Sequence, residues 1–141
     1  MISDLLIVDL WDKTITMEEK TKRKMTPQEL EERLIEFASR IIDLVEALPK
    51  GSAAAKHLGG QLLRSGTSPA LNYGEAQATE SRDDFVHKMK ICLKELRETL
   101  VCLKLIKRRK WFADNKLEPL LAENNELVSI FVASLKTATG K

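Results

Sequence analysis

The stretch QLLRSGTSPALNYGEAQATESRDDFVHKMKICLKELRETLVCLKL, residues 61–105, decides the fold of this chain. Its first part is rich in small and polar residues, which let a neighbouring helix approach closely. Ser81 then introduces a long segment whose apolar residues recur at helical spacing on more than one face. The stretch therefore predicts a helix bundle that commits part of its surface to other copies of the same chain.

Upstream of this stretch the sequence predicts two amphipathic helices. Thr26 and Glu29 form a capping box, and an apolar residue follows at every third or fourth position until residues 49–51, Pro-Lys-Gly, end the helix. A second helix is predicted from Ser52 to about residue 78. Pro69 removes one of its hydrogen bonds and bends it.

Two further helices follow. Ser81 caps the third, with acidic residues in its first turn, and Asn115 with Glu118 can cap the fourth. Because the four helices are joined by short connections, neighbours are expected to be antiparallel. The predicted fold class is all-α, an up-down-up-down four-helix bundle over residues 26–137.

Residues 1–25 are predicted to be an N-terminal extension and linker. They contain apolar residues that suit docking on another surface: Ile2, Leu5, Leu6, Ile7, Val8, Leu10, Trp11 and Ile15. A short helix or strand is expected there. A cluster of four cations follows, at Lys20, Lys22, Arg23 and Lys24. This cluster suits either a solvated linker or a nucleic-acid-binding arm.

The composition limits the class of protein. The chain has 141 residues, 43% apolar and 31% charged, with a net charge of +2, which suits one globular domain and does not by itself predict nucleic-acid binding. No apolar run is long enough to span a bilayer, and the N-terminus lacks a basic start, so a cytoplasmic location is expected. Cys92 and Cys102 lie too far apart on one helix to pair, so both are expected to be core residues.

No arrangement of residues predicts catalysis, a metal or a cofactor. Residues 59–60, Gly-Gly, lack the context of a phosphate-binding loop, and residues 65–68 are not a nucleophile elbow. A di-iron bundle needs two Glu-x-x-His pairs, whereas the chain offers only Asp84 with His87. Both histidines, His57 and His87, have a lysine beside them and are expected at the surface. We therefore predict a protein that is not an enzyme. The hypothesis of a metal-dependent bundle enzyme has no support other than the fold class.

Charge is unevenly distributed along the chain. Residues 83–110 hold nine cations and four acids, a net charge of +5, whereas residues 27–48 hold six acids and two arginines, a net charge of −4. The basic segment is a candidate surface for a phosphate backbone or an acidic partner. Its candidate binding residues are Lys88, Lys104, Lys107, Arg108, Arg109 and Lys110.

The cations of this segment also suit roles that involve no nucleic acid. Lysine–glutamate pairs such as Lys94 with Glu98 can simply solvate a helix. The run at residues 107–110, followed by Trp111 and Phe112, suits backbone binding with base stacking, or equally helix-end capping beside a core-packed tryptophan. Separately, Arg64 is expected to pair with Glu95 or Glu98 on the next helix.

The residues L-L-R-S-x-T-S with Asn72, and S-R-x-D-F-x-x-K-x-x-I-x-x-K-E-L-x-E-T, resemble a known family. They look like the bacterial four-helix-bundle proteins first noticed as open reading frames within intervening sequences of 23S ribosomal RNA genes. The resemblance covers about residues 30–131. The first 25 residues exceed what that family pattern contains.

This resemblance implies an antiparallel bundle that assembles into a ring, typically a pentamer, with no assigned activity for most members. A related branch comprises accessory proteins of diversity-generating retroelements, which associate with a reverse transcriptase and nucleic acid. The family pattern includes Lys88 and eight further residues. We take these eight as bundle and ring contacts: Arg64, Ser68, Asn72, Glu75, Asp84, Phe85, Glu95 and Glu98.

The predicted function is that of a non-enzymatic homo-oligomer that binds RNA or a ribonucleoprotein partner through a basic surface. A reverse transcriptase or a ribosomal component is the kind of partner that the resemblance implies. The alternative is a protein-interaction scaffold with no nucleic-acid contact. Polarised charge and the apolar N-terminal segment favour this alternative. No membrane partner is expected.

Overall fold

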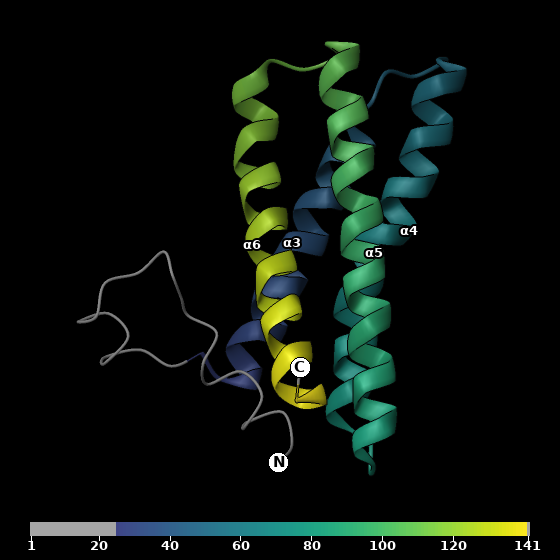
Figure 1. Cartoon of the computed structure of the whole chain (residues 1–141). Helices are drawn as coiled ribbons and strands as arrows, with labels where there is room; N and C mark the ends of the chain where they lie inside the picture. The colour runs from purple at the N-terminus through teal and green to yellow at the C-terminus, as the bar shows by residue number, and fades with distance from the viewer. Residues whose placement is uncertain (1–24, 141) are drawn as a thin grey trace, which may run out of the picture.

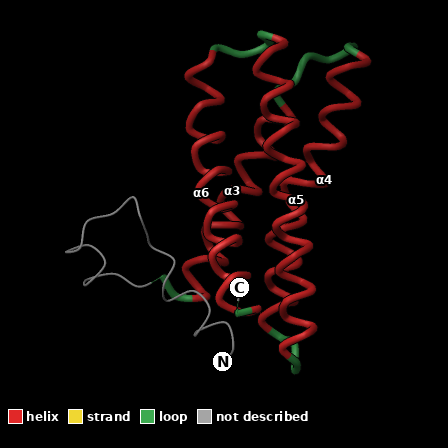
Figure 2. Tube along the Cα trace, in the orientation of Figure 1, coloured by secondary structure: helices red, strands yellow, loops and turns green. Residues whose placement is uncertain are grey.

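The computed structural model describes residues 25–140, and their only regular secondary structure is α-helix. Four helices, α3 (Pro27–Glu46), α4 (Ala53–Gln77), α5 (Arg82–Arg109) and α6 (Asp114–Thr139), pack against one another (Figures 1 and 2). The prediction of an all-helical, four-helix protein is confirmed. The expected helix or strand and the basic cluster in the first 24 residues lie outside the described residues.

Three of the four predicted helix starts are confirmed in detail. The Thr26 hydroxyl accepts a hydrogen bond from the Glu29 amide (3.1 Å), and the Glu29 carboxylate accepts one from the Thr26 amide (3.0 Å), which completes the capping box. The hydroxyls of Ser52 and Ser81 cap α4 and α5 by accepting hydrogen bonds from the amides of Ala55 and Asp84 (3.1 Å each). These caps satisfy backbone donors that the first helical turn leaves unpaired.

The predicted cap of the fourth helix is wrong. α6 begins at Asp114, its N-cap position is Ala113, and no side chain caps it. Lys110 adopts a left-handed conformation (φ 59°) that ends α5, so the connection to α6 is short. Asp114 places a negative charge in the first turn, where it stabilises the positive end of the helix dipole.

The far end of α6 is fixed by a contact with α5. Arg82 donates a hydrogen bond to the Ala138 carbonyl (2.9 Å), and Ala138 is buried. This contact satisfies a carbonyl that the helix end would leave unpaired, so α6 continues to Thr139. At the other end of the described chain, the Met25 side chain is also buried in the core.

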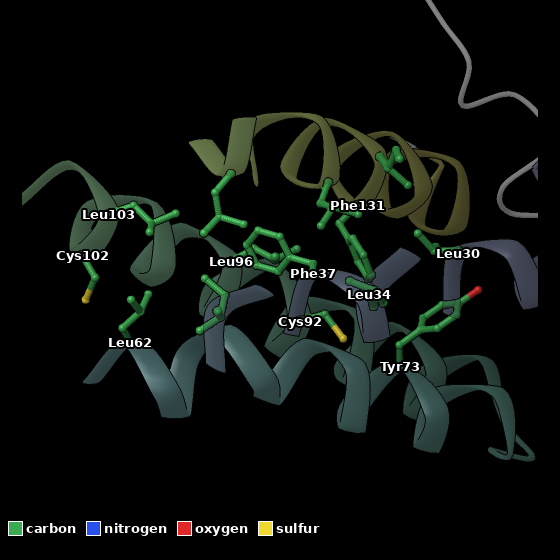
Figure 3. Packing of buried hydrophobic residues seen from close by; sticks show 14 of the residues in the cluster. Leu30, Leu34, Phe37, Leu62, Tyr73, Cys92, Leu96, Cys102, Leu103 and Phe131 are labelled. Atoms are coloured by element: carbon green, nitrogen blue, oxygen red, sulfur yellow. The ribbon is translucent and has the colours of Figure 1, made fainter. Parts of the chain in front are cut away.

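Each helix packs against the next one in the chain, while α3 and α6 make the fewest contacts of the neighbouring pairs. The α3–α4 and α5–α6 connections lie at one end of the molecule, and the α4–α5 connection lies at the other (Figure 1). Apolar side chains of all four helices fill the space between them (Figure 3). Tyr73 and Phe131 meet edge to face, with ring centroids 5.9 Å apart.

The contact between α3 and α4 depends on a glycine. A Cβ atom at Gly66 would lie 2.7 Å from Cγ2 of Ile41, closer than side chains tolerate. The small residue therefore lets the two helices approach, as its position in a stretch of small residues predicts. α4 also continues through Pro69, which lies inside the helix.

Polar contacts join α3 to α6. Arg33 donates two hydrogen bonds to the Glu123 carboxylate, each 2.8 Å long, and approaches Glu126 at 3.2 Å. The bonds to Glu123 raise the pKa of the Arg33 guanidinium above its ordinary value. Since this helix pair packs least, a bidentate ion pair forms much of what connects it.

Both cysteines are free and buried, as expected. Cys92 donates a hydrogen bond from its thiol to the Pro69 carbonyl (3.5 Å between S and O), and burial raises the pKa of that thiol to about 12. Burial also raises the pKa of the Cys102 thiol. Among residues 25–140, no helix combines the length and apolar character needed to cross a membrane.

Candidate nucleic-acid interface

The outward side of α5 carries a row of cations. At 3.6 residues per turn, a sector about 100° wide contains five cations and two apolar residues, which we call the basic face: Lys90, Lys94, Arg97, Val101, Lys104, Leu105 and Arg108. All seven side chains are exposed. The opposite side of the helix packs into the core through residues such as Met89, Leu96 and Leu103. The basic face runs about 27 Å along the helix, at ~1.5 Å per residue.

None of the five cations on the basic face forms an ion pair with another residue in 25–140. Lys94 and Glu98 are four residues apart, the spacing at which a helical ion pair is expected. Glu98 instead accepts a hydrogen bond from Arg64 of α4. The expected Lys94–Glu98 pair is therefore absent, and Lys94 keeps an uncompensated charge.

Three of the predicted binding residues already have carboxylate partners. Lys88 lies 2.6 Å from a Glu75 oxygen, so its ammonium group is paired with α4. Lys107 approaches Glu118 of α6 at 3.5 Å, and Lys110 approaches an oxygen of the residue four positions on, Asp114, at 3.6 Å. These lysines have less charge available for an external ligand than the lysines of the basic face.

The other three predicted binding residues are exposed and without an ion pair in the described chain. Lys104 and Arg108 belong to the basic face, and Arg109 lies at its end. Lys90, Lys94 and Arg97 were not among the predicted candidates. Their spacing of three and four residues marks one helical face, and this spacing is the sequence signal that could have identified them.

The expected pairing of Arg64 is confirmed with both candidate partners. One guanidinium nitrogen lies 3.1 Å and 3.3 Å from the Glu95 carboxylate oxygens, and the other is bonded to Glu98 and to Gln61 (3.1 Å). The Glu95 side chain is 8% exposed, whereas that of Arg64 is 54% exposed. The network thus neutralises a buried carboxylate and positions α4 against α5.

The remaining residues of the family pattern have architectural positions. Asn72 donates hydrogen bonds to the Ser68 hydroxyl (2.8 Å) and carbonyl (3.0 Å) one turn earlier in α4. Phe85 is 2% exposed and lies in the core of the chain. Glu75 is exposed beside Lys88, and Asp84 is exposed in the first turn of α5. These contacts hold helices and side chains in place, and none of them pairs a nucleophilic side chain with a general base.

The aromatic residues that follow the basic run face inward. Trp111 and Phe112 are half-buried and pack against the core. This position agrees with helix-end packing, and it makes both rings poor platforms for stacking a base.

The described residues offer no cluster of three or more histidine, cysteine or acidic side chains arranged to hold a metal ion. His57 and His87 are both exposed, as expected. The arrangement on α5 is suited to charge-based recognition. A row of exposed cations neutralises successive phosphates and releases their counterions.

Comparison with known proteins agrees with this architecture. Residues 27–133 match the family described as 23S rRNA-intervening sequence protein. The chain belongs to this family. The family resemblance drawn from the sequence motifs is therefore confirmed.

A solved structure supports the same assignment. It is a protein of unknown function from the S23 ribosomal protein family of Bacteroides thetaiotaomicron, and it shares 32% sequence identity with this chain. The similarity has a TM-score of 0.69 and covers 75% of this chain and 97% of that one. No curated protein matches the chain significantly.

Proposed function

We propose that this 23S rRNA-intervening sequence protein is a non-enzymatic, homo-oligomeric, cytoplasmic bundle that binds RNA through the basic face of α5. The observation that carries the proposal is the row of five exposed cations without ion pairs in the described chain. The other lysines of α5 and its C-cap Lys110 have carboxylate partners, so the available positive charge lies on the basic face and on the adjacent Arg109. The names of the matching family and of the solved relative refer to ribosomal RNA and to a ribosomal protein family, which supports RNA as the ligand.

The proposed assembly is a ring, with a pentamer as the expected size. Within one subunit, the positions of the connections in Figure 1 support an up-down-up-down bundle. Among residues 25–140, six large apolar side chains are exposed in the single chain: Ile35, Ile42, Leu63, Leu71, Val101 and Leu105. Exposed apolar residues that lie beside one another, such as Val101 and Leu105 one turn apart on α5, are typical of surfaces that contact other chains. Light scattering tests this part, and a stable single subunit at micromolar concentration would contradict it.

RNA binding is tested by fluorescence anisotropy with a labelled, structured fragment of 23S rRNA, over a series of salt concentrations. One variant replaces three lysines of the basic face with glutamine: Lys90, Lys94 and Lys104. The matched control replaces the three ion-paired lysines in the same way: Lys88, Lys107 and Lys110. Both variants change the net charge equally and differ only in which lysines are lost.

We expect the face variant to bind more weakly, and its plot of log affinity against log salt to be shallower by about 2–3, because up to three phosphate contacts are lost. The control should retain most of the wild-type slope. Equal weakening of both variants would mean that net charge alone matters. Absence of salt-sensitive binding in the wild type would refute RNA binding.

A protein-interaction scaffold is the second candidate. Val101 and Leu105 interrupt the cations of the basic face with side chains that are 57% and 45% exposed. An apolar centre within a charged rim is typical of protein interfaces. A protein partner, such as a reverse transcriptase or a ribosomal protein, that remains bound after nuclease treatment would favour this function over direct RNA binding.

A further inference from the structure

A cavity of about 500 Å³ opens between the end of α3 and the start of α4. Val45, Leu48 and Leu63 form its apolar walls, and small residues of α4 such as Gly59 leave room beside them. Leu63 is 40% exposed, so part of the apolar wall faces solvent. Lys50 and Lys56 also line the cavity, and none of the described residues that line it carries a carboxylate.

Exposed apolar residues of α3 lead from this cavity toward the start of the helix. Ile35 and Ile42 are seven residues apart and therefore lie on one side of α3. Glu31, one turn before Ile35, lies close to Gly74 of α4, so this side of α3 is the one beside α4. We call the cavity together with these two isoleucines the α3–α4 groove.

The chain itself contains a segment with matching chemistry. This segment is residues 2–15, which contain eight large apolar residues. It also contains three aspartates and one lysine: Asp4, Asp9, Asp12 and Lys13. Its net charge of −2 is opposite to that of Lys50 and Lys56, which line the cavity, so the aspartates suit the cavity and not the side of α3 that carries Glu31. This segment would bring both apolar side chains and compensating carboxylates to the cavity.

The length of the intervening chain permits this contact. Residues 16–24 number nine and can span up to about 30 Å when extended. The cavity begins beside Val45, about 27 Å from residue 27 along α3 at ~1.5 Å per residue. Residues 2–15 can therefore lie along the groove while residue 25 remains in the core.

We propose that residues 2–15 of the same chain dock in the α3–α4 groove. Their apolar side chains cover Leu63 and the cavity beside it, and their aspartates face Lys50 and Lys56. The segment thus shields Ile35, Ile42 and Leu63, and Leu71, Val101 and Leu105 remain for contacts between chains. This proposal does not depend on RNA binding, since the groove is formed by α3 and α4 and the basic face lies on α5.

Tryptophan fluorescence of the full chain tests the proposal. The chain has two tryptophans, Trp11 and Trp111, and the substitution Trp111→Phe leaves Trp11 as the reporter. We expect Trp11 to emit at shorter wavelength than free tryptophan and to be poorly quenched by acrylamide, independently of protein concentration. Solvent-accessible Trp11 would overturn the proposal, and protection that appears only as concentration rises would show that a second copy supplies the contact.

Two matched substitutions identify the surface that protects Trp11. Leu63→Gln alters the groove, and Leu105→Gln alters a leucine of similar exposure on α5. Trp11 emission should shift to longer wavelength with Leu63→Gln and stay unchanged with Leu105→Gln. Equal effects of the two, or no effect of Leu63→Gln, would overturn the proposal.

A charge reversal provides a second variant on the groove. Lys56→Glu places a carboxylate opposite the aspartates and should also expose Trp11, with helical content checked by circular dichroism. Because Lys56 is exposed, this change leaves the core intact and tests the groove even where Leu63→Gln fails to fold. Unchanged Trp11 protection in a folded Lys56→Glu variant would contradict the assigned role of the groove lysines.

Discussion

α4 contacts its two neighbours through different chemistry. Against α3 it presents Gly66, and the two helices approach until Ile41 fills the space where a side chain would be. Against α5 it presents Arg64, which holds the carboxylates of Glu95 and Glu98, and Ser65, whose hydroxyl is bonded to that of Thr99 (2.9 Å). Shape determines how close the first pair can pack, whereas polar partners fix the alignment of the second.

The largest effect is expected where shape decides the contact. Gly66→Ala forces a Cβ atom to within 2.7 Å of a β-branched core residue and should destabilise the fold by about 2–3 kcal/mol. Gly60→Ala is the matched control, because a Cβ there meets nothing within 4 Å. It should stabilise the helix by about 0.5–1 kcal/mol. Urea unfolding measures both, and similar values for the two variants would contradict the close packing of α3 on α4.

A smaller effect is expected at the polar contact. Arg64→Ala leaves the buried Glu95 carboxylate without its cation and should cost about 1–2 kcal/mol, reduced by the exposure of the arginine. Glu98→Gln removes only the more exposed partner and should cost less than about 1 kcal/mol. Chemical unfolding of the two variants checks this order. A larger loss for Glu98→Gln would mean that the outer pair carries the contact.

The last prediction concerns the Cys92 thiol, which lies between α4 and α5 and whose titration has no effect on stability at neutral pH. Its thiol pKa is raised from 9.0 to about 12, so the unfolded chain loses this proton at lower pH than the folded chain. Stability should therefore fall between pH 9 and 12, by up to about 1.4 kcal/mol per pH unit. Cys92→Ala removes this contribution, so unfolding free energies of the variant and the wild type should converge as the pH rises. Parallel pH profiles would show that the thiol does not titrate as described.

The sequence predicted the starts of three helices correctly and the start of the fourth incorrectly. The starts of α3, α4 and α5 were predictable because Thr26, Ser52 and Ser81 each accept a hydrogen bond from the amide three residues later. The start of α6 was not, since no side chain caps it and the charge of Asp114 alone marks its first turn.

The candidate interface shows the same limit. Helical spacing alone places the cations of the basic face on one side of α5. Which lysines keep an available charge depends on carboxylates from other helices, such as Glu75 beside Lys88 and Glu118 beside Lys107. Arg64 reaches across from α4 to take Glu98, and Lys94 becomes available as a result. The sequence predicted the pairing of Arg64 with Glu98, but it did not predict the partners of Lys88 and Lys107, because those contacts depend on how distant segments pack.

The sparse contact between the first and last helices has a consequence for how the molecule comes apart. Arg33 connects α3 to α6 largely through charge, while every other neighbouring pair shares an extensive packed surface. Two helical hairpins, α3–α4 and α5–α6, therefore meet along one strong boundary and one weak one. We therefore expect thermal opening to separate α3 from α6 first, while the two hairpins stay in contact along α4 and α5.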